Sequence, residues 1–180
     1  TGDAGTILTS VDGTTWTVQT SETDKPLRGA TYGNNVFVVV GYDGTIVTSP
    51  DGTTWTAQTS GTANGLYLII YENNTFVTLG ALGTILTSPD GTTWTTQTSG
   101  ITKSLEGVAY GNNNFVAVSN DDGGTVIILT SPDGVTWSQI PSGTISLFSI
   151  TYANSTFVTV GGGGTILTSS DVITSSATVS

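Results

Sequence analysis

The chain contains no cysteine, no histidine and no methionine among its 180 residues. Without cysteine there can be no disulfide and no thiolate metal site. Without histidine there can be no imidazole metal ligand and no Ser-His-Asp catalytic group. No Gly-rich phosphate loop occurs between a strand and a helix either, so we expect no cofactor.

Basic residues are also scarce, with 3 Lys and Arg against 13 Asp and Glu and a net charge of −10. Nucleic acid is therefore excluded as a partner, because phosphate binding requires clustered basic side chains. No apolar run is long enough to span a membrane, so we expect no membrane insertion. Charged residues make up only 9% of a chain that is rich in Ser and Thr. This composition favours an extracellular or cell-surface location.

One segment recurs along the whole chain. Gly-Thr-Ile-Val-Thr-Ser-Pro-Asp-Gly-Thr-Thr-Trp occupies residues 44–55, and related copies begin at Gly5, Gly83 and Gly124. A degenerate fifth copy begins at Gly164. The first three copies are 39 residues apart, and the fourth is slightly lengthened. A repeat of this length predicts a solenoid or a propeller.

Each repeat predicts four short strands, and no stretch has helical periodicity with helix caps. In the first repeat we expect strands at residues 6–10, 15–19, 27–32 and 36–40. Asp-Gly and Gly-Asn-Asn sequences between them are typical hairpin turns. A period near 40 with four strands is typical of a β-propeller blade. We therefore predict an all-β chain, a β-propeller of about four to five four-stranded blades.

The repeated aromatic residues are interpreted as packing residues. A single blade cannot bury both faces of its sheet, so stacked blades must cover each other with apolar side chains. The tryptophans are expected at blade-to-blade or outer-rim positions, and the second strand of the first repeat is expected to carry the first of them. They are Trp16, Trp55, Trp94 and Trp137.

The sequence Ser-Pro-Asp-Gly-Thr-Thr-Trp at residues 49–55 resembles the Asp-box of BNR-type β-propellers. The whole unit, including Tyr-Gly-Asn-Asn-x-Phe-Val, is similar to bacterial surface propellers and to photosystem II assembly-factor-like repeats. Asp and Gly are adjacent here, whereas the usual Asp-box separates them, which predicts a tighter turn. The resemblance implies structural turn residues on the side away from any ligand. They are Asp12, Asp51, Asp90 and Asp133. In the fifth copy Val172 replaces the turn Gly, so Asp171 is not expected to keep this role.

The acidic and basic inventory argues against catalysis. By the same resemblance, a sialidase active site would contain a cluster of three arginines, whereas this chain has a single arginine, Arg28. A two-carboxylate glycosidase needs paired acids about 5 to 10 Å apart. Glu106 lies in a predicted third strand, and no other repeat supplies an acid at that position. We expect no enzymatic activity.

Two weaker motifs concern metal and glycan. Asp121 and Asp122 are adjacent and are weak candidates for a Ca²⁺ site, although a solvated loop is the favoured interpretation. Asn73 and Asn154 each begin an Asn-x-Thr triplet and are candidates for N-glycosylation. Both lie in predicted turns before a fourth strand, where a glycan would be exposed.

Two classes of function remain open. The first is a non-enzymatic extracellular structural or adhesive repeat protein, which includes the subunit of a surface filament. The alternative is a carbohydrate-binding, lectin-like propeller with a shallow site on each blade. Such a site needs ligand residues repeated at equivalent positions, yet Tyr42 is not repeated. Lys25 and Lys103 are equivalent, but Asn64 and Ile145 break that series.

The ends of the chain do not match a complete set of blades. We divide the chain into a repeat domain, residues 1–163, and a degenerate fifth repeat, residues 164–180. The first two strands can complete the last blade and so close a four-bladed ring, which leaves the fifth repeat without a place. We therefore expect the segment from Thr165 to Val179 to mediate self-association by strand exchange. The alternatives are a half-built fifth blade, or a chain that is one piece of a longer propeller.

Overall fold

The computed structural model describes residues 2–120 and 124–169, and within them the regular structure is antiparallel β-sheet with short 3-10 turns. This confirms the predicted all-β class. The chain divides into two compact units, one formed by residues 1–78 and 86–96 and the other by residues 79–85 and 97–180. No helix in the described ranges is long and apolar enough to cross a membrane.

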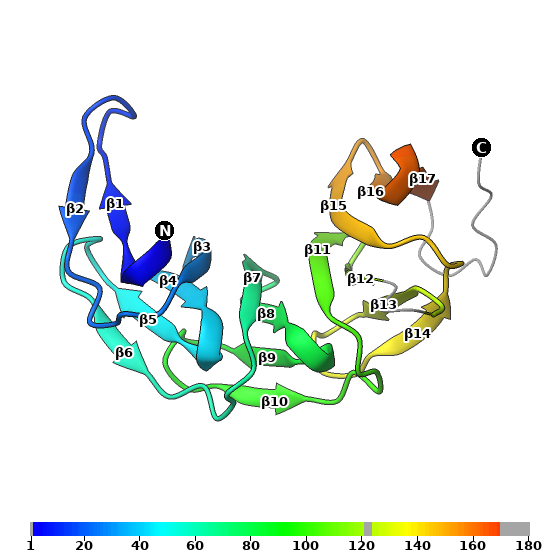
Figure 1. Cartoon of the computed structure of the whole chain (residues 1–180), viewed down its shortest axis with the longest axis horizontal. Coiled ribbons are helices and arrows are strands. Elements are labelled where there is room, and N and C mark those ends of the chain that lie inside the picture. Colours follow the sequence, from blue (N-terminus) through cyan, green and yellow to red (C-terminus); the bar gives the residue numbers. More distant parts are fainter. Residues whose placement is uncertain (1, 121–123, 170–180) are drawn as a thin grey trace. The chain divides into compact units, whose positions relative to one another are not determined.

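The first unit begins with a two-stranded sheet, followed by a complete four-stranded one (Figure 1). After the turn η1 (Asp3–Gly5), β1 (Ile7–Thr9) pairs with β2 (Thr17–Gln19). The four-stranded sheet contains β3 (Leu27–Gly33), β4 (Val36–Gly41), β5 (Ile46–Ser49) and β6 (Thr56–Gln58), in sequence order. The turn η2 (Tyr42–Gly44) connects β4 to β5.

The later sheets repeat this order. The next sheet contains β7 (Leu66–Glu72), β8 (Thr75–Gly80), β9 (Ile85–Ser88) and β10 (Thr95–Gln97), with η3 (Ala81–Gly83) after β8. The following sheet contains β11 (Leu105–Gly111), β12 (Asn114–Ser119), β13 (Ile127–Ser131) and β14 (Ser138–Pro141). The last contains β15 (Leu147–Ala153), β16 (Thr156–Gly161) and β17 (Ile166–Ser169), with η4 (Gly162–Gly164) after β16.

The tight turn between the first two strands of each full repeat follows from its sequence. Between β3 and β4 the two loop residues, Asn34 and Asn35, have φ of 45° and 60°. Positive φ at both positions is the requirement of the type I′ hairpin turn, and Asn adopts it more readily than most residues. The predicted hairpin is therefore found at this position.

One strand boundary was predicted wrongly. Trp16 was expected inside the second strand of its repeat, but β2 begins only at Thr17. The cause is local, because the Asp12 carboxylate accepts hydrogen bonds from the backbone N–H groups of Thr14 and Thr15. These donors are therefore held in the turn, and each tryptophan precedes its strand instead of belonging to it.

Neighbouring sheets within a unit pack through their first strands, β3 against β7 and β11 against β15. This close approach needs glycine. A Cβ on Gly33 would lie 2.0 Å from the Tyr71 ring, and one on Gly111 would lie 2.1 Å from the Tyr152 ring. The β3–β6 and β7–β10 sheets also share a buried cluster. It includes Val38, Val40, Ile46, Leu66, Ile69, Phe76 and Leu86.

The fifth repeat contributes one described strand, β17, which pairs with β16 of the same chain. Residues 166–169 of the segment expected to exchange with a neighbouring subunit are therefore already paired. The rest of that segment, and Asp171 with it, lies outside the described residues. Strand exchange at this end thus requires β17 to leave its place beside β16.

Candidate functional site

The Asp-Gly turns form a repeated hydrogen-bond network. In the second copy Asp51 Oδ1 accepts the backbone N–H groups of Thr53 and Thr54, both at 2.8 Å. Ser49 Oγ donates to the same oxygen at 3.0 Å and accepts the Gly52 N–H at 2.8 Å. The same Ser-Asp bond and the same two backbone donors to the carboxylate occur at Asp12, Asp90 and Asp133.

The network also sets the charge state of these carboxylates. Hydrogen bonds from the backbone of Thr54 and Thr53 stabilise the ionised form and hold the pKa of Asp51 well below its ordinary value. The pKa values of Asp12, Asp90 and Asp133 are lowered by equivalent bonds. A carboxylate engaged in this way stays ionised and is a weak base, so the geometry suits a turn-stabilising role.

The tryptophans that follow these turns differ in exposure. Each indole N–H donates to the carbonyl of its turn glycine, at 3.2 Å for Trp55. Trp55 is only 7% exposed and packs with Ile7 and Val47. Trp94 and Trp137 are half-buried. Trp16 is 57% exposed, and its two-stranded sheet lacks the strand that carries the phenylalanine beside Trp94 in the β7–β10 sheet.

An aromatic and cationic cluster lies at the start of β3. Arg28 occupies the register irregularity between Leu27 and Gly29 in the β3–β4 pair. Such bulges re-aim a side chain out of the regular ladder. The Arg28 guanidinium lies 5.6 Å from the ring centres of both Tyr42 and Tyr67, within the range of a cation–π contact.

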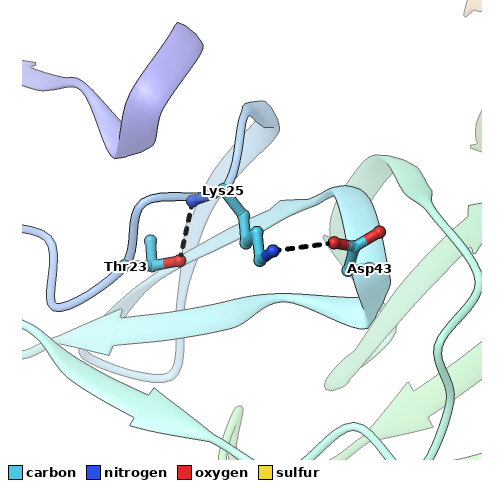
Figure 2. A network of polar contacts seen from close by, with 3 residues as sticks. All are labelled: Thr23, Lys25 and Asp43. Carbon is cyan, nitrogen blue, oxygen red and sulfur yellow. Dashed lines mark hydrogen bonds and ion pairs between the residues drawn. The ribbon is translucent and has the colours of Figure 1, made fainter.

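An ion pair lies beside this cluster. Lys25 Nζ is 3.1 Å from Asp43 Oδ2, and the Lys25 backbone N–H donates to Thr23 Oγ1 at 3.1 Å (Figure 2). The hydrogen bond and charge of Asp43 raise the pKa of Lys25. Both side chains are largely exposed, so the pair contributes little to stability. It does neutralise Lys25, whereas no ion pair to Arg28 occurs among the described residues.

The Arg28 cluster was not predicted from the sequence, although the sequence contains a signal for it. Arg28, Tyr42 and Tyr67 each depart from the residues at the same position of the other repeats. Where the framework is repeated, a non-repeated residue is free to serve a local role. Tyr42 is not repeated, so a search for ligand residues shared by all blades does not select it.

The remaining predicted site residues are not brought together. Asp121 and Asp122 lie outside the described ranges, and within those ranges no group of three acidic residues is placed to hold a metal. Asn73 and Asn154 are exposed in the turns before β8 and β16, with φ of 49° and 48°. Their exposure is compatible with glycosylation, which remains a prediction.

An open groove borders the two-stranded sheet. It has a volume of about 780 Å³ and lies between β1–β2 and the sheet of β3–β6. Its apolar lining includes Ile7, Leu8, Trp16, Phe37, Val39 and Trp55. In the four-stranded sheets the third strand is paired on both sides, whereas β1 pairs with β2 alone among the residues that the structure describes. The groove is thus bordered by one unpaired strand edge.

No family model matches the chain, and no curated protein sequence matches it. Solved structures do. The chain is similar to YCF48 bound to D1 peptide, with a TM-score of 0.71 and 19% identity over 97% of this chain and 59% of that one. YCF48 from Cyanidioschyzon merolae gives a TM-score of 0.64 and 17% identity over 86% and 56%. A chain of the nidogen/laminin complex gives 0.58 and 14% over 98% and 89%.

These similarities define the class of the protein. The chain has a β-propeller repeat fold, as the sequence predicted. It spans about 59% of the length of the YCF48 chain in the peptide complex. At such low identities the comparison establishes the fold and leaves the ligand to be argued from this chain's own residues.

Proposed function

We propose that the protein is a non-enzymatic, extracellular or cell-surface structural or adhesive module that works through protein–protein contacts, including contacts between its own copies. The observation that carries the proposal is the open strand edge of β1 beside exposed apolar side chains. Among the described residues the β1–β2 sheet has two strands, whereas the β3–β6, β7–β10 and β11–β14 sheets have four.

Incomplete sheets favour assembly for a physical reason. An unpaired strand edge presents backbone N–H and C=O groups that a strand of another chain can pair with. The β1–β2 sheet also leaves apolar side chains exposed, with Leu8 at 42% and Val18 at 70%. Exposed apolar groups beside an open edge are characteristic of interaction surfaces. Subunits joined head to tail in this way form a filament unless the rotation closes a ring.

The structural comparisons support peptide or protein binding as the general class of function. YCF48 was solved with a D1 peptide and nidogen with laminin, so propellers of similar fold bind peptides and proteins. The turn carboxylates of this chain are engaged by backbone donors, which argues against their use as acid or base.

Carbohydrate binding is the second candidate, favoured by one observation. Tyr42 and Tyr67 present aromatic rings beside Arg28, with ring centres 6.0 Å apart. Aromatic faces beside a hydrogen-bond donor are suited to a sugar ring. The site is a single one, so it would bind one glycan per chain. A glycan array compares wild type with Tyr67→Ala, and binding lost in that variant would support this candidate.

Self-association is tested by immobilising one copy and passing the soluble protein over it in biolayer interferometry. We expect saturable binding that strengthens with salt, because salt screens the repulsion between chains of net charge −10. Trp94→Phe serves as a matched control, because Trp94 packs beside Phe76 in the β7–β10 sheet and does not line the groove beside β1–β2. Absence of binding up to high micromolar concentration would contradict the proposal.

A further inference from the structure

The strands β1 and β17 have the same sequence. Residues 5–10 and residues 164–169 both read Gly-Thr-Ile-Leu-Thr-Ser. Both strands follow a 3-10 turn, and the N–H groups of Thr6 and Thr165 donate to the carbonyls of Asp3 and Gly162, each at 3.1 Å. The two segments therefore present the same side chains from the same kind of local backbone.

We propose that the β1–β2 hairpin of one copy replaces β17 beside β16 of a second copy. The inference rests on the proposed self-association and names the segments that carry it. In the observed pairing Val160, Thr159 and Val158 of β16 lie opposite Ile166, Leu167 and Thr168 of β17. The shared sequence places Ile7, Leu8 and Thr9 opposite the same three residues.

Leu8 matches a buried position of the second copy, the one that Leu167 occupies in the observed structure. In the observed structure Leu167 is 7% exposed and packs with Val118, Val126 and Leu147. Leu8 occupies the same position in the repeat but is 42% exposed. After exchange Leu8 fills the site that Leu167 leaves, so the buried cluster stays intact while an exposed leucine becomes covered.

Trp16 and Phe157 are complementary in the same way. In the β7–β10 sheet the rings of Phe76 and Trp94 are 6.4 Å apart. The last sheet supplies the equivalent phenylalanine, Phe157, whereas the matching position later in the chain is Ser175. Trp16 has no aromatic ring contact in the described part of the chain. Exchange places Trp16 beside Phe157.

The other face of the sheet that β16 forms with the β1–β2 hairpin is also complementary between the two copies. Val38 and Val40 of β4 pack against Leu66 and Phe76 of the next sheet. The residues of β16 at the same repeat positions are Val158 and Val160, and Val160 is 42% exposed. Once β16 pairs with β1, these valines face the groove that contains Phe37, which is 37% exposed.

Exchange also adds a strand. Among the described residues β17 is the third strand of its sheet, whereas the β1–β2 hairpin supplies a third and a fourth. Each exchange covers the open edge of β1 and builds a four-stranded blade. The contact is heterologous, with a different surface on each partner, so it repeats from copy to copy.

Cysteine pairs test this register directly, because the chain has no cysteine of its own. Leu8→Cys protein is mixed with Thr159→Cys protein under mild oxidation, and non-reducing electrophoresis reads the product. Residues directly opposite in an antiparallel pair have Cβ atoms about 4.5 to 5.5 Å apart. We expect a disulfide-linked dimer from this mixture. Deleting residues 165–180 from the Thr159→Cys partner removes the competing strand and should raise its yield.

The matched control pairs Leu8→Cys with Val158→Cys, whose side chain points to the other face of the sheet. Equal yields from both mixtures would overturn the proposed register. If the wild-type chain self-associates but the 8–159 pair does not cross-link, this inference fails and the proposed function stands. If the wild-type chain does not self-associate, both fail. A cross-linked monomer from one chain carrying both cysteines would show closure within the chain and would overturn exchange.

Discussion

The ring of Trp94 lies 6.4 Å from the ring of Phe76, while Trp16, at the same position of the first repeat, is 57% exposed. The two tryptophans follow the same turn and donate the same indole hydrogen bond. They differ because the β7–β10 sheet contains its first two strands and the β1–β2 sheet does not. The exposure of Trp16 is therefore a property of the incomplete sheet.

We expect Trp55→Ala and Trp16→Ala to separate folding from assembly. Trp55 is 7% exposed, so its truncation should lower the free energy of unfolding by about 3 to 5 kcal/mol. Trp16→Ala should leave the unfolding of the dilute protein nearly unchanged and weaken self-association. Chemical denaturation and the binding assay measure the two effects. Equal destabilisation by both substitutions would mean that Trp16 is already packed in the isolated chain.

Gly33→Ala should destabilise the first unit strongly. The added methyl would lie 2.0 Å from Cγ of Tyr71, so the ring or the strand must move. Overpacking of this kind typically costs about 1 to 3 kcal/mol. Thermal unfolding measures the effect, and adding Tyr71→Ala to the variant should recover part of the loss by making room. No recovery in the double variant would show that the cost has another origin.

Acid should destabilise the fold through the four turn carboxylates. Their pKa values are lowered in the folded state, so their contribution is fully present above the unfolded-state pKa of about 3.9. It is lost progressively as the pH falls below that value towards the folded-state pKa. The melting temperature, measured from pH 7 to pH 2, should therefore begin to decrease once the pH is below about 4.

Asp51→Asn and Asp90→Asn provide the matched test of this assignment. Each variant should be less stable than wild type at pH 7, because the charged acceptor of two backbone N–H groups is lost. Each should also show a smaller drop between pH 4 and pH 2. An unchanged acid profile in both variants would place the acid-sensitive groups elsewhere. Self-association should persist in Asp90→Asn, because that turn lies outside the exchanged strands and outside the groove beside β1.

The repeat period, the two-residue Asn turns and the strand order were predictable from sequence, because each depends on local backbone preference or on spacing. The position of Trp16 before its strand was not, because it depends on which N–H groups the Asp12 carboxylate captures. The Arg28 cluster was also missed. It brings together Tyr42 and Tyr67, which are far apart in the sequence, through the packing of β3 and η2 against β7.

Assembly of the chain with its own copies is tested by its native mass in solution. Sedimentation velocity is run over a wide concentration range, and negative-stain microscopy images the largest species. If copies exchange strands, we expect species at multiples of the chain mass of 18.4 kDa, in proportions that increase with concentration. The images should show rings or filaments of repeated subunits. A single species of 18.4 kDa at every concentration would contradict it.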